Sequence, residues 1–366
     1  MAGNQYAAAG VDYEVLDRAK TGAVAAAAST SGLLELAGAR ALDASRGEPA
    51  FVFELGDRTF AFVVEGLGTK AMITRRHHQQ TGEELYAAVA TDTVATIVND
   101  LLCVGALPLV VNAYFATGGN GVFDDPAASA SLIEGWRAAC EQAGATWGGG
   151  ESPSLPGLVH DGELELAGAA VGAVPEGRSA VLGADLAPGD RIVLLASSGL
   201  HANGASIIRK LADDLPDGYA TPLPSGTTLG RATLEPSTLY VAFARHLLAG
   251  DAEVTYLNHI TGHGFRKLMR PTAELTYRVT DLQPVPEVLA WVADQLDMDA
   301  HEAYGTFNMG SGFAVCCRAG SVPAVLEAAE AAGIGALDAG EVEAGPRQVI
   351  VEPIGATFGG DELQLR

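Results

Sequence analysis

The stretch Thr93–Pro108, TVATIVNDLLCVGALP, decides how the first half of this chain folds, because an apolar segment of helical length carries two adjacent polar residues. Asn99 and Asp100 stand directly before a turn marked by Gly105 and Pro108. Burying an amide and a carboxylate among aliphatic side chains is costly unless they meet a ligand, a metal or hydrogen-bond partners. The stretch therefore predicts a helix that carries part of a functional site.

Helical spacing extends this polar set in both directions. Asp92, Thr96, Asn99 and Cys103 recur at i, i+4, i+7 and i+11, and Asp100 lies beside them, so one helix face gathers the oxygen ligands. The alternative is a solvated polar face on an amphipathic helix, which is the commoner explanation for a single Asp on a helix. The apolar flanks favour the site.

Length and composition set the architecture. A chain of 366 residues exceeds the size at which one core usually keeps growing, so we expect two domains. Hydrophobic residues make up 48% of the chain and there are 45 glycines, which fits an α/β protein with many tight loops. Linker-type residues at Pro175–Arg178 mark the boundary. We predict an α/β (α+β) fold with domains at residues 1–174 and 175–366.

The net charge of −23 repels nucleic-acid phosphates and anionic membranes, and no basic stripe offsets it. No apolar run approaches the roughly 20 residues needed to cross a bilayer, and the N-terminus lacks the pattern of a secretory leader. We therefore expect a cytoplasmic protein. The four cysteines have no zinc-site spacing and are expected as buried free thiols: Cys103, Cys140, Cys316 and Cys317.

Apolar segments and turn residues predict alternating strands and helices. In the first half we expect a hairpin of residues 51–55 and 59–64, a helix from Thr81, strands at 109–115 and 164–174, and a helix at 127–143. In the second half we expect a strand at 191–196 followed by a Gly-rich loop and a helix, a short helix at 266–269, and a β-α-β return from 313–317, 323–332 and 348–352.

Two glycine-containing segments carry candidate ligands for nucleotide phosphates. In Glu65–Lys70, EGLGTK, glycines let backbone N–H groups approach a phosphate, the lysine supplies charge and the acid holds Mg²⁺, although such a segment alone is more often a plain turn. In Trp147–Ser152, WGGGES, Glu151 follows three glycines, and the alternative is a mobile surface loop. With Asp100, these two acids form the oxygen set that a Mg²⁺ carrying nucleotide phosphates needs.

Two histidine-containing loops follow predicted strands. SSGLHANG (Ser197–Gly204) places His201 near a helix N-terminus, where it acts as an acid or base or donates to a phosphate, although a lone loop His is usually an ordinary surface residue. HITGHGF (His259–Phe265) repeats the arrangement and lacks further zinc ligands, which favours anion binding. His77 and His78, after two arginines, indicate a solvated basic patch.

These motifs, in this order along almost the whole chain, resemble the aminoimidazole ribonucleotide synthetases, also called phosphoribosylformylglycinamidine cyclo-ligases. Several motifs in one order are far more specific than any single one. The matching segments are AAGVDYE near Ala9, VNDLLCVGALP, YFATG at Tyr114, GGES with the PG at Pro156, SSGLHANG, LEPSTLY at Leu234, HITGHGF and TFNMGSG at Thr306.

The resemblance implies an N-terminal domain whose sheet forms a barrel across a homodimer, and a C-terminal α/β domain with helices on a mixed sheet. It also implies ATP held with Mg²⁺ between Gly-rich loops. In that family ATP phosphorylates a formyl amide oxygen of a phosphorylated small molecule, and an amidine nitrogen then closes the imidazole ring as phosphate leaves.

Carried over position by position, the resemblance implies roles for individual residues. The catalytic candidates are His201, Lys20 and Asp92. The nucleotide-binding candidates are Thr69, Lys70, Asn99, Gly149, Gly150 and Thr261. The metal-ligand candidates are Glu65, Asp100 and Glu151.

Four positions depart from the family pattern, all in loops expected to contact ligand: Glu65 replaces Asp, Ser154 replaces an acid, His263 replaces Gly and Met309 replaces Cys. An imidazole where bare backbone approaches a phosphate changes the pocket. Three hypotheses remain. The chain is a working cyclo-ligase, a paralogue that uses ATP to phosphorylate an amide or carbonyl oxygen of another substrate, or a degenerate member that binds nucleotide or a partner without turnover.

Overall fold

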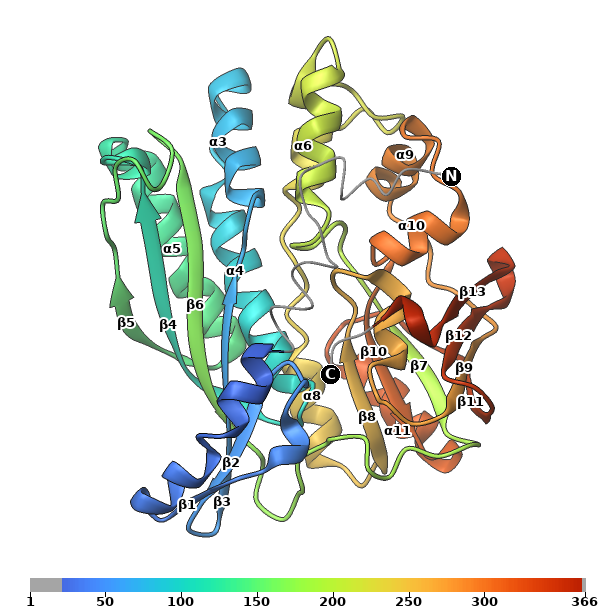
Figure 1. Cartoon of the computed structure of the whole chain (residues 1–366). Coiled ribbons are helices and arrows are strands. Elements are labelled where there is room, and N and C mark those ends of the chain that lie inside the picture. Colours follow the sequence, from blue (N-terminus) through green and yellow to red (C-terminus); the bar gives the residue numbers. More distant parts are fainter. Residues whose placement is uncertain (1–21, 364–366) are drawn as a thin grey trace.

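The computed structural model describes residues 22–363, and its strands form two sheets, one in each half of the chain (Figure 1). The predicted boundary at residues 174 and 175 falls in the connection between the last strand of the first sheet and the first strand of the second. No helix within residues 22–363 combines the length and apolar character needed to cross a bilayer.

The first sheet has six strands in the order β1-β2-β3-β6-β4-β5. Its strands are β1 (Ala39–Ala41), β2 (Phe51–Leu55), β3 (Arg58–Gly66), β4 (Leu107–Thr117), β5 (Thr146–Glu151) and β6 (Leu164–Ala173). Its helices are α3 (Lys70–Thr81), α4 (Tyr86–Leu102) and α5 (Pro126–Ala143), with 3₁₀ turns η1 (Ser31–Ala37), η2 (Asp43–Ser45) and η3 (Gly121–Asp124). The expected hairpin is confirmed, because Leu55 pairs with Arg58 across a two-residue turn.

One face of this sheet is covered and the other is open. Along β3, Ala61 and Val63 are buried while Phe62 and Val64 are exposed, which is the two-residue alternation of a strand with one packed face. Glu65 has the parity of the buried pair, so its side chain lies on the face that α4 covers. The strand period thus directs this acid toward the helix that carries Asn99 and Asp100.

The second sheet has seven strands in the order β13-β12-β9-β11-β7-β10-β8, and only β12 and β9 run parallel. Its strands are β7 (Arg191–Ala196), β8 (Val254–His259), β9 (Leu275–Val279), β10 (Ser311–Cys317), β11 (Ala336–Ala344), β12 (Gln348–Val351) and β13 (Ala356–Gly359). The mixed sheet with helices that was expected here is confirmed.

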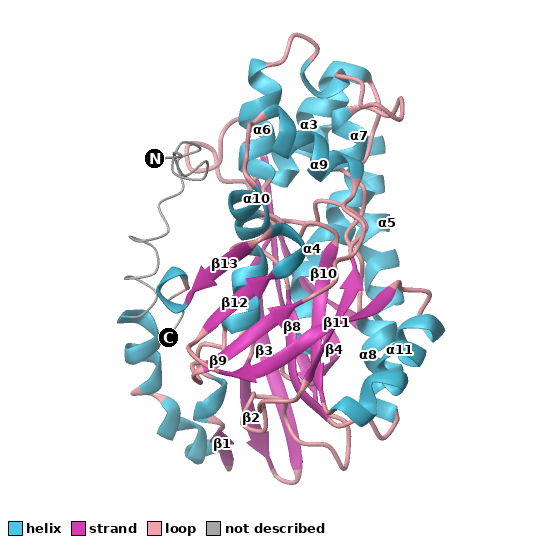
Figure 2. Cartoon of the chain, turned by 90° about the vertical axis from the view of Figure 1, so that its right-hand side faces the viewer, coloured by secondary structure: helices cyan, strands magenta, loops and turns pink. Residues whose placement is uncertain are grey.

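The helices of the second half are α6 (Ala205–Asp214), α7 (Leu229–Thr233), α8 (Val241–Ala249), α9 (Glu287–Gln295), α10 (Ala300–Thr306) and α11 (Val322–Ala331). Its 3₁₀ turns are η4 (Gly218–Ala220), η5 (Gly264–Met269), η6 (Ala319–Ser321), η7 (Glu352–Ile354) and η8 (Gly360–Glu362). Helices α3 and α6, one from each half, stand side by side at one end of the molecule (Figures 1 and 2).

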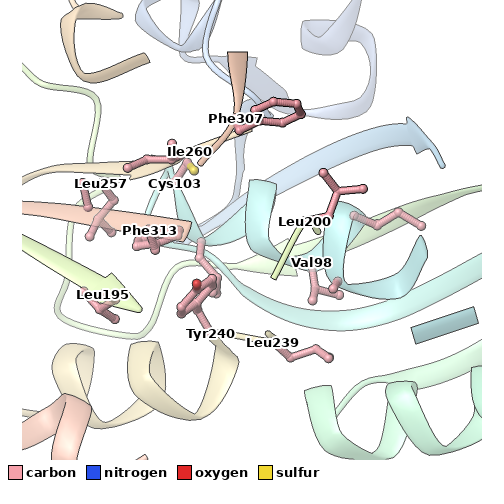
Figure 3. Packing of buried hydrophobic residues seen from close by; sticks show 14 of the residues in the cluster. Val98, Cys103, Leu195, Leu200, Leu239, Tyr240, Leu257, Ile260, Phe307 and Phe313 are labelled. Atoms are coloured by element: carbon pink, nitrogen blue, oxygen red, sulfur yellow. The ribbon is translucent and has the colours of Figure 1, made fainter. Parts of the chain in front are cut away.

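The two halves share one continuous hydrophobic core. We call the region where α4 packs against the second half of the chain the seam. There, Val98 and Cys103 near the end of α4 lie among residues of the second half (Figure 3). The rings of Tyr240 and Phe313 pack there with centroids 5.2 Å apart. The expected buried free thiols are confirmed at all four cysteines.

The prediction of a helix from Thr81 was wrong at its start. The segment Lys70–Thr81 is itself the helix α3, and α4 begins five residues later at Tyr86. The buried face of α3 includes Lys70, Thr74 and His77, so no apolar period revealed the helix. His77 is buried and pairs with Glu83, which corrects the solvated basic patch expected at this residue.

Two further segments differ from what the sequence suggested. The Trp147–Glu151 segment, for which no strand was expected and a mobile surface loop was the alternative, is the edge strand β5, and it pairs in parallel with β4. A Cβ at Gly150 would lie 2.0 Å from the carbonyl oxygen of Ala113, so this glycine lets the two strands approach. The expected short helix at 266–269 is part of the 3₁₀ turn η5.

Candidate functional site

A buried ion pair lies at the start of α3. Lys70 is the first residue of that helix, and its Nζ lies 2.7 Å from Oδ2 of Asp92 in α4, with both side chains fully buried. Neither of these two atoms makes a hydrogen bond of ordinary geometry. An ammonium has three N–H donors, so this ion pair leaves donors of Lys70 without an acceptor in a dry environment. Such a group is suited to a further anion.

The carboxylate of Asp92 also connects the two halves of the chain. Its Oδ1 accepts hydrogen bonds from the hydroxyl of Ser237 and from the Ser237 backbone N–H at 2.9 Å. Burial raises the pKa of Asp92, while the positive charge of Lys70 and the Ser237 bonds oppose that rise. The polar helix face is therefore not solvated, because its acid is held by the second half.

Asn99 makes a second connection of the same kind. Its Nδ2 donates to the carbonyl oxygen of Thr238 at 2.9 Å, and its Oδ1 accepts the backbone N–H of Tyr240 at 3.0 Å. The side chain is fully buried. Both ends of the amide are thus used within the chain, so Asn99 acts in this structure as a link between the halves.

Asp100 faces the end of β8. Its Oδ1 lies 2.8 Å from Nδ1 of His259, the last residue of that strand. Burial alone would raise the pKa of Asp100, but the His259 hydrogen bond and the nearby positive charges of His259, Lys267 and Arg270 outweigh burial and lower it. An ionised carboxylate only accepts, so Nδ1 of His259 carries the proton of this bond.

Glu65, at the end of β3, lies close enough to Asp100 to be affected by its charge. Burial, and then the negative charge of Asp100, raise the pKa of Glu65 from 4.5 to about 7. This is the expected behaviour of two carboxylates held near each other without an intervening cation. The pair is a donor set that fits a hard divalent cation, for which one or two carboxylates and several waters or phosphates are usual.

Glu151 does not join these two acids within one chain. It pairs with Tyr114, which pairs with Ala167, which pairs with Gly66, so three strand spacings, or about 14 Å, separate it from the end of β3. Its side chain is exposed. Across residues 22–363, no group of three or more His, Cys, Asp or Glu side chains is arranged to hold a metal ion.

His201 is buried in the loop after β7, with a left-handed backbone at φ 60°. Its Nε2 accepts the backbone N–H groups of Ser198 at 3.3 Å and Thr238 at 3.4 Å. The proton of the neutral ring is therefore on Nδ1, which is buried without a partner among the described residues. Burial, and then the charges of His259 and Lys70, lower the pKa of His201 well below 6.5. The ring is a neutral donor.

The remaining candidates lie around this seam or away from it. Thr69 caps α3, and its Oγ1 is 2.9 Å from Oγ of Ser206 in α6. Thr261 follows β8 by two residues. Gly149 and Gly150 lie on the edge strand β5. Lys20 lies outside the described residues.

Two groups of residues at the candidate site were given no role from the sequence, although one of them, Ser237–Tyr240, lies in the LEPSTLY segment. The partners of α4 at Ser237–Tyr240 supply mainly backbone groups, which carry no residue-type signal. Lys267 on η5 and Arg270 directly after it are cations whose charges affect the pKa values of Glu65 and Asp100, and the sequence did not suggest them. A signal was present in the run FRKLMR, where charged residues interrupt a segment that is otherwise apolar.

Comparisons with known proteins agree on the kind of fold and family. The N-terminal domain model of the AIR synthase related proteins matches residues 47–174, and the C-terminal domain model matches residues 187–352. A phosphoribosylformylglycinamidine cyclo-ligase from Methanothermobacter thermautotrophicus is 34% identical over 269 residues, which is 73% of this chain and 75% of that protein.

Two solved structures share the fold at low identity. The hydrogenase maturation protein HypE in complex with ATP superposes with a TM-score of 0.58 at 18% identity, covering 81% of this chain and 83% of that one. AaThiL complexed with AMPPCP and TMP has a TM-score of 0.57 at 14% identity, covering 84% and 87%. These similarities extend across both halves of the described chain.

The raised pKa of Glu65 gives a pH signature. Between pH 4.5 and about 7 the folded protein binds this proton more readily than the unfolded chain, so the contribution of Glu65 to stability falls as pH rises through that window. Glu65→Gln removes the free-energy cost of ionising this buried carboxyl group. We expect the variant to gain on the order of 2 kcal/mol in unfolding free energy, relative to the unmodified protein, between about pH 5 and about pH 8.

Denaturant unfolding at several pH values measures this difference. Glu176→Gln, in the exposed connection between β6 and β7, is the control for losing one surface carboxylate. Identical pH profiles for Glu65→Gln and the unmodified protein would contradict the proposed environment of Glu65.

Proposed function

The chain belongs to the AIR synthase related protein family, and from that premise we propose that it is an ATP-dependent cyclo-ligase acting on formylglycinamidine ribonucleotide. The products are aminoimidazole ribonucleotide, ADP and phosphate, which makes this a step of purine biosynthesis. The 34% identity to a cyclo-ligase over 73% of the chain supports the reaction. The low-identity neighbours that hold ATP or AMPPCP share its fold.

The observation that carries the proposal is a pair of buried donors at the seam between the halves. Lys70 keeps ammonium hydrogens without acceptors, and His201 keeps an Nδ1–H without an acceptor. The charge of Lys70 affects the pKa of His201, so the two groups are close. Positive charge and a fixed N–H donor together suit a phosphoryl group whose negative charge changes during transfer.

The reaction needs this assistance because an amide oxygen is a poor leaving group. The γ-phosphoryl group moves from ATP to the formyl amide oxygen and ADP departs. The amidine nitrogen then attacks the same carbon, the carbon–oxygen bond breaks, and phosphate leaves as the ring closes and a proton is lost. Each step places negative charge on phosphoryl oxygens, where a buried cation is most effective.

In this proposal the residues divide by what they hold. Lys70 neutralises phosphoryl oxygens and Asp92 holds Lys70 in place, while His201 donates from Nδ1 and remains neutral. Its Nε2 already accepts two backbone N–H groups, which favours donation to a phosphate over proton transfer. Glu65 and Asp100 would hold Mg²⁺, which supplies charge to neutralise the nucleotide phosphates.

The other candidates keep supporting roles in the proposal. Thr69, Thr261, Gly149 and Gly150 would line the path of the nucleotide, and Lys20 would approach from the N-terminal arm. Asn99 would act by holding the segment Thr238–Tyr240 rather than by touching nucleotide, because its amide is already used at both ends.

We further propose that the enzyme is a homodimer that closes over the open face of the first sheet. Phe62, Val64 and Tyr114 on that face are 42%, 63% and 37% exposed, and the strands β1 and β5 leave both edges of the sheet unpaired within the described chain. An apolar face beside a free strand edge is typical of an interface. A second copy would cover both features, as a barrel across the dimer requires.

Sedimentation velocity tests the dimer. We expect the unmodified protein to sediment as a dimer and the double variant Phe62→Glu, Val64→Glu to sediment as a monomer, because four charges would be buried in the interface. Ile133→Glu, at an exposed position of helix α5, is the matched control and should remain dimeric. A dimeric double variant would contradict this interface.

A direct assay tests the reaction. With ATP, Mg²⁺ and formylglycinamidine ribonucleotide, we expect ADP and the aminoimidazole product in equal amounts. Lys70→Met should lower kcat/KM by roughly 10²-fold or more, because it removes the buried cation. Lys210→Gln, on the exposed side of α6, removes the same charge elsewhere and should leave kcat/KM unchanged. Full activity of Lys70→Met would contradict the assignment.

A second candidate function is the same chemistry on another substrate. His263 and Met309 adopt left-handed backbone at φ 72° and 44°, and both side chains are buried. Glycine adopts such angles without strain, so His263 keeps the backbone of the glycine it replaces while adding a side chain, and Met309 places a larger side chain where the family has Cys. Bulk added where a substrate binds favours a different acceptor.

The same assay separates the two candidates. ADP formed without imidazole, together with cyclo-ligase activity gained by His263→Gly, would support the altered acceptor. Equal ADP and imidazole in the unmodified protein would exclude it. Absence of nucleotide binding would instead support a member that has lost turnover.

A further inference from the structure

Arg270 is a buried cation for which the described chain provides no partner. It follows η5 directly, and the residue is only 9% exposed. Its Nε and Nη1 are buried without any hydrogen-bond acceptor. No carboxylate among residues 22–363 forms an ion pair with it, although other arginines of the chain do so at 2.6–3.5 Å.

The groups around Arg270 do not satisfy it. Glu65 and Asp100 are near enough to be affected by its charge, but Asp100 is engaged by His259. Tyr256 is also nearby, and its hydroxyl donates to Glu48 at 2.8 Å. A guanidinium has five donors and no acceptor, so a buried one without partners is costly. Each such group in a folded protein needs an explanation.

A second cation stands beside it. Lys267 lies three residues before Arg270, on the 3₁₀ turn that Arg270 directly follows. Burial, and then the charge of Arg270, lower the pKa of Lys267 to about 8. Within residues 22–363 its ammonium forms no hydrogen bond or ion pair, although the charges of Asp100 and Glu65 act on it. Two neighbouring unpaired cations create a strong preference for an anion.

We propose that Arg270 and Lys267 form an anion subsite that binds a phosphoryl group of a ligand. The planar fork of Arg270 would bind two phosphoryl oxygens, and Lys267 would contribute a point charge to the third. The choice of a phosphoryl group rests on the proposed function, whose substrate and nucleotide both carry one. The existence of an anion subsite rests only on the two unpaired cations.

The two acids beside the subsite limit the side from which an anion can approach it. Glu65 and Asp100 would repel a free anion approaching from their side, so the phosphoryl group must bind through the cations. The field of a chain with net charge −23 opposes any anion, and local cations are what overcome it. Lys267 and Arg270 are positioned to do this at the same seam that holds Lys70.

Arg270→Met tests the subsite, because methionine keeps an unbranched side chain without charge or donors. Removing an unpaired buried charge should leave the thermal unfolding temperature of the unliganded protein unchanged or higher. Inorganic phosphate at millimolar concentration should raise the unfolding temperature of the unmodified protein but not that of the variant. The dissociation constant for phosphate should rise about tenfold or more, because charge-assisted bonds are lost.

Arg137→Gln is the matched control, since it removes one guanidinium from the exposed surface of α5 and should retain the full phosphate effect. Equal phosphate stabilisation in Arg270→Met and the unmodified protein would overturn the proposal. A lower unfolding temperature for Arg270→Met without phosphate would also overturn it, because that result assigns Arg270 a structural partner, including one in the segments outside residues 22–363.

Two further ligands identify the source of the phosphoryl group. If Arg270→Met loses the rise in unfolding temperature with ribose 5-phosphate but keeps the rise with ATP, the subsite belongs to the substrate. The reverse result would assign it to the nucleotide. Either result supports the subsite. If Arg270→Met keeps both responses, the proposal is overturned. These binding results do not depend on turnover, so failure of the cyclo-ligase assay leaves them interpretable.

Discussion

The structure depends on the requirement that polar groups buried in one helix find partners. Helix α4 is apolar on nearly every side, and it carries Asp92, Asn99 and Asp100 into a dry environment. Each finds its partners across the seam or at the helix that precedes α4: Lys70 and Ser237, Thr238 and Tyr240, and His259. Left unpaired, each group would cost about 1–3 kcal/mol or more, so the second half of the chain must dock in one orientation.

That constraint also explains where the chemistry is placed. Docking brings the N-terminal end of α3, the loop of His201 and the turn η5 to the same region as the end of α4. In this region the buried groups without a hydrogen-bond partner among the described residues include three donors, Lys70, Nδ1 of His201 and Arg270, and one acceptor, Oδ2 of Asp92, which lies against Lys70. A buried region in which unpartnered donors outnumber unpartnered acceptors is suited to an anion, and such local violations of packing rules are expected at functional sites.

The sequence predicted much of this architecture because apolar periods and turn residues are strong local signals. The hairpin of β2 and β3, the strands β4, β6 and β7 and the helix α5 were all predicted within a few residues. Helix α3 was missed because its buried face carries Lys70, Thr74 and His77, so the apolar period of an amphipathic helix is absent. Strand β5 was missed because three glycines suggest a loop, whereas close approach of β4 requires Gly148 and Gly150, and Gly149 has the left-handed backbone that favours glycine.

The sequence predicted many residues of the candidate site but not the contacts that each of them makes. Buried Asn99 and Asp100 were expected to need partners, and the choice between a ligand and the chain itself required the fold. Three acids were expected around one metal, but only Glu65 and Asp100 lie near each other within the described chain. The order of the strands places Glu151 three strands away, and sequence periodicity does not reveal strand order. Arg270 was not anticipated, since an unpaired guanidinium is recognised only once its surroundings are known.

Hydrogen exchange of the amides in Ser237–Tyr240 tests most directly whether α4 fixes the second half. The account predicts protection of the Tyr240 amide in the unmodified protein, and an exchange rate at least about tenfold faster at this segment in Asn99→Ala, with the amides of α11 unchanged. Exchange at Tyr240 that is unaffected by Asn99→Ala, or that rises equally in α11, would contradict the account.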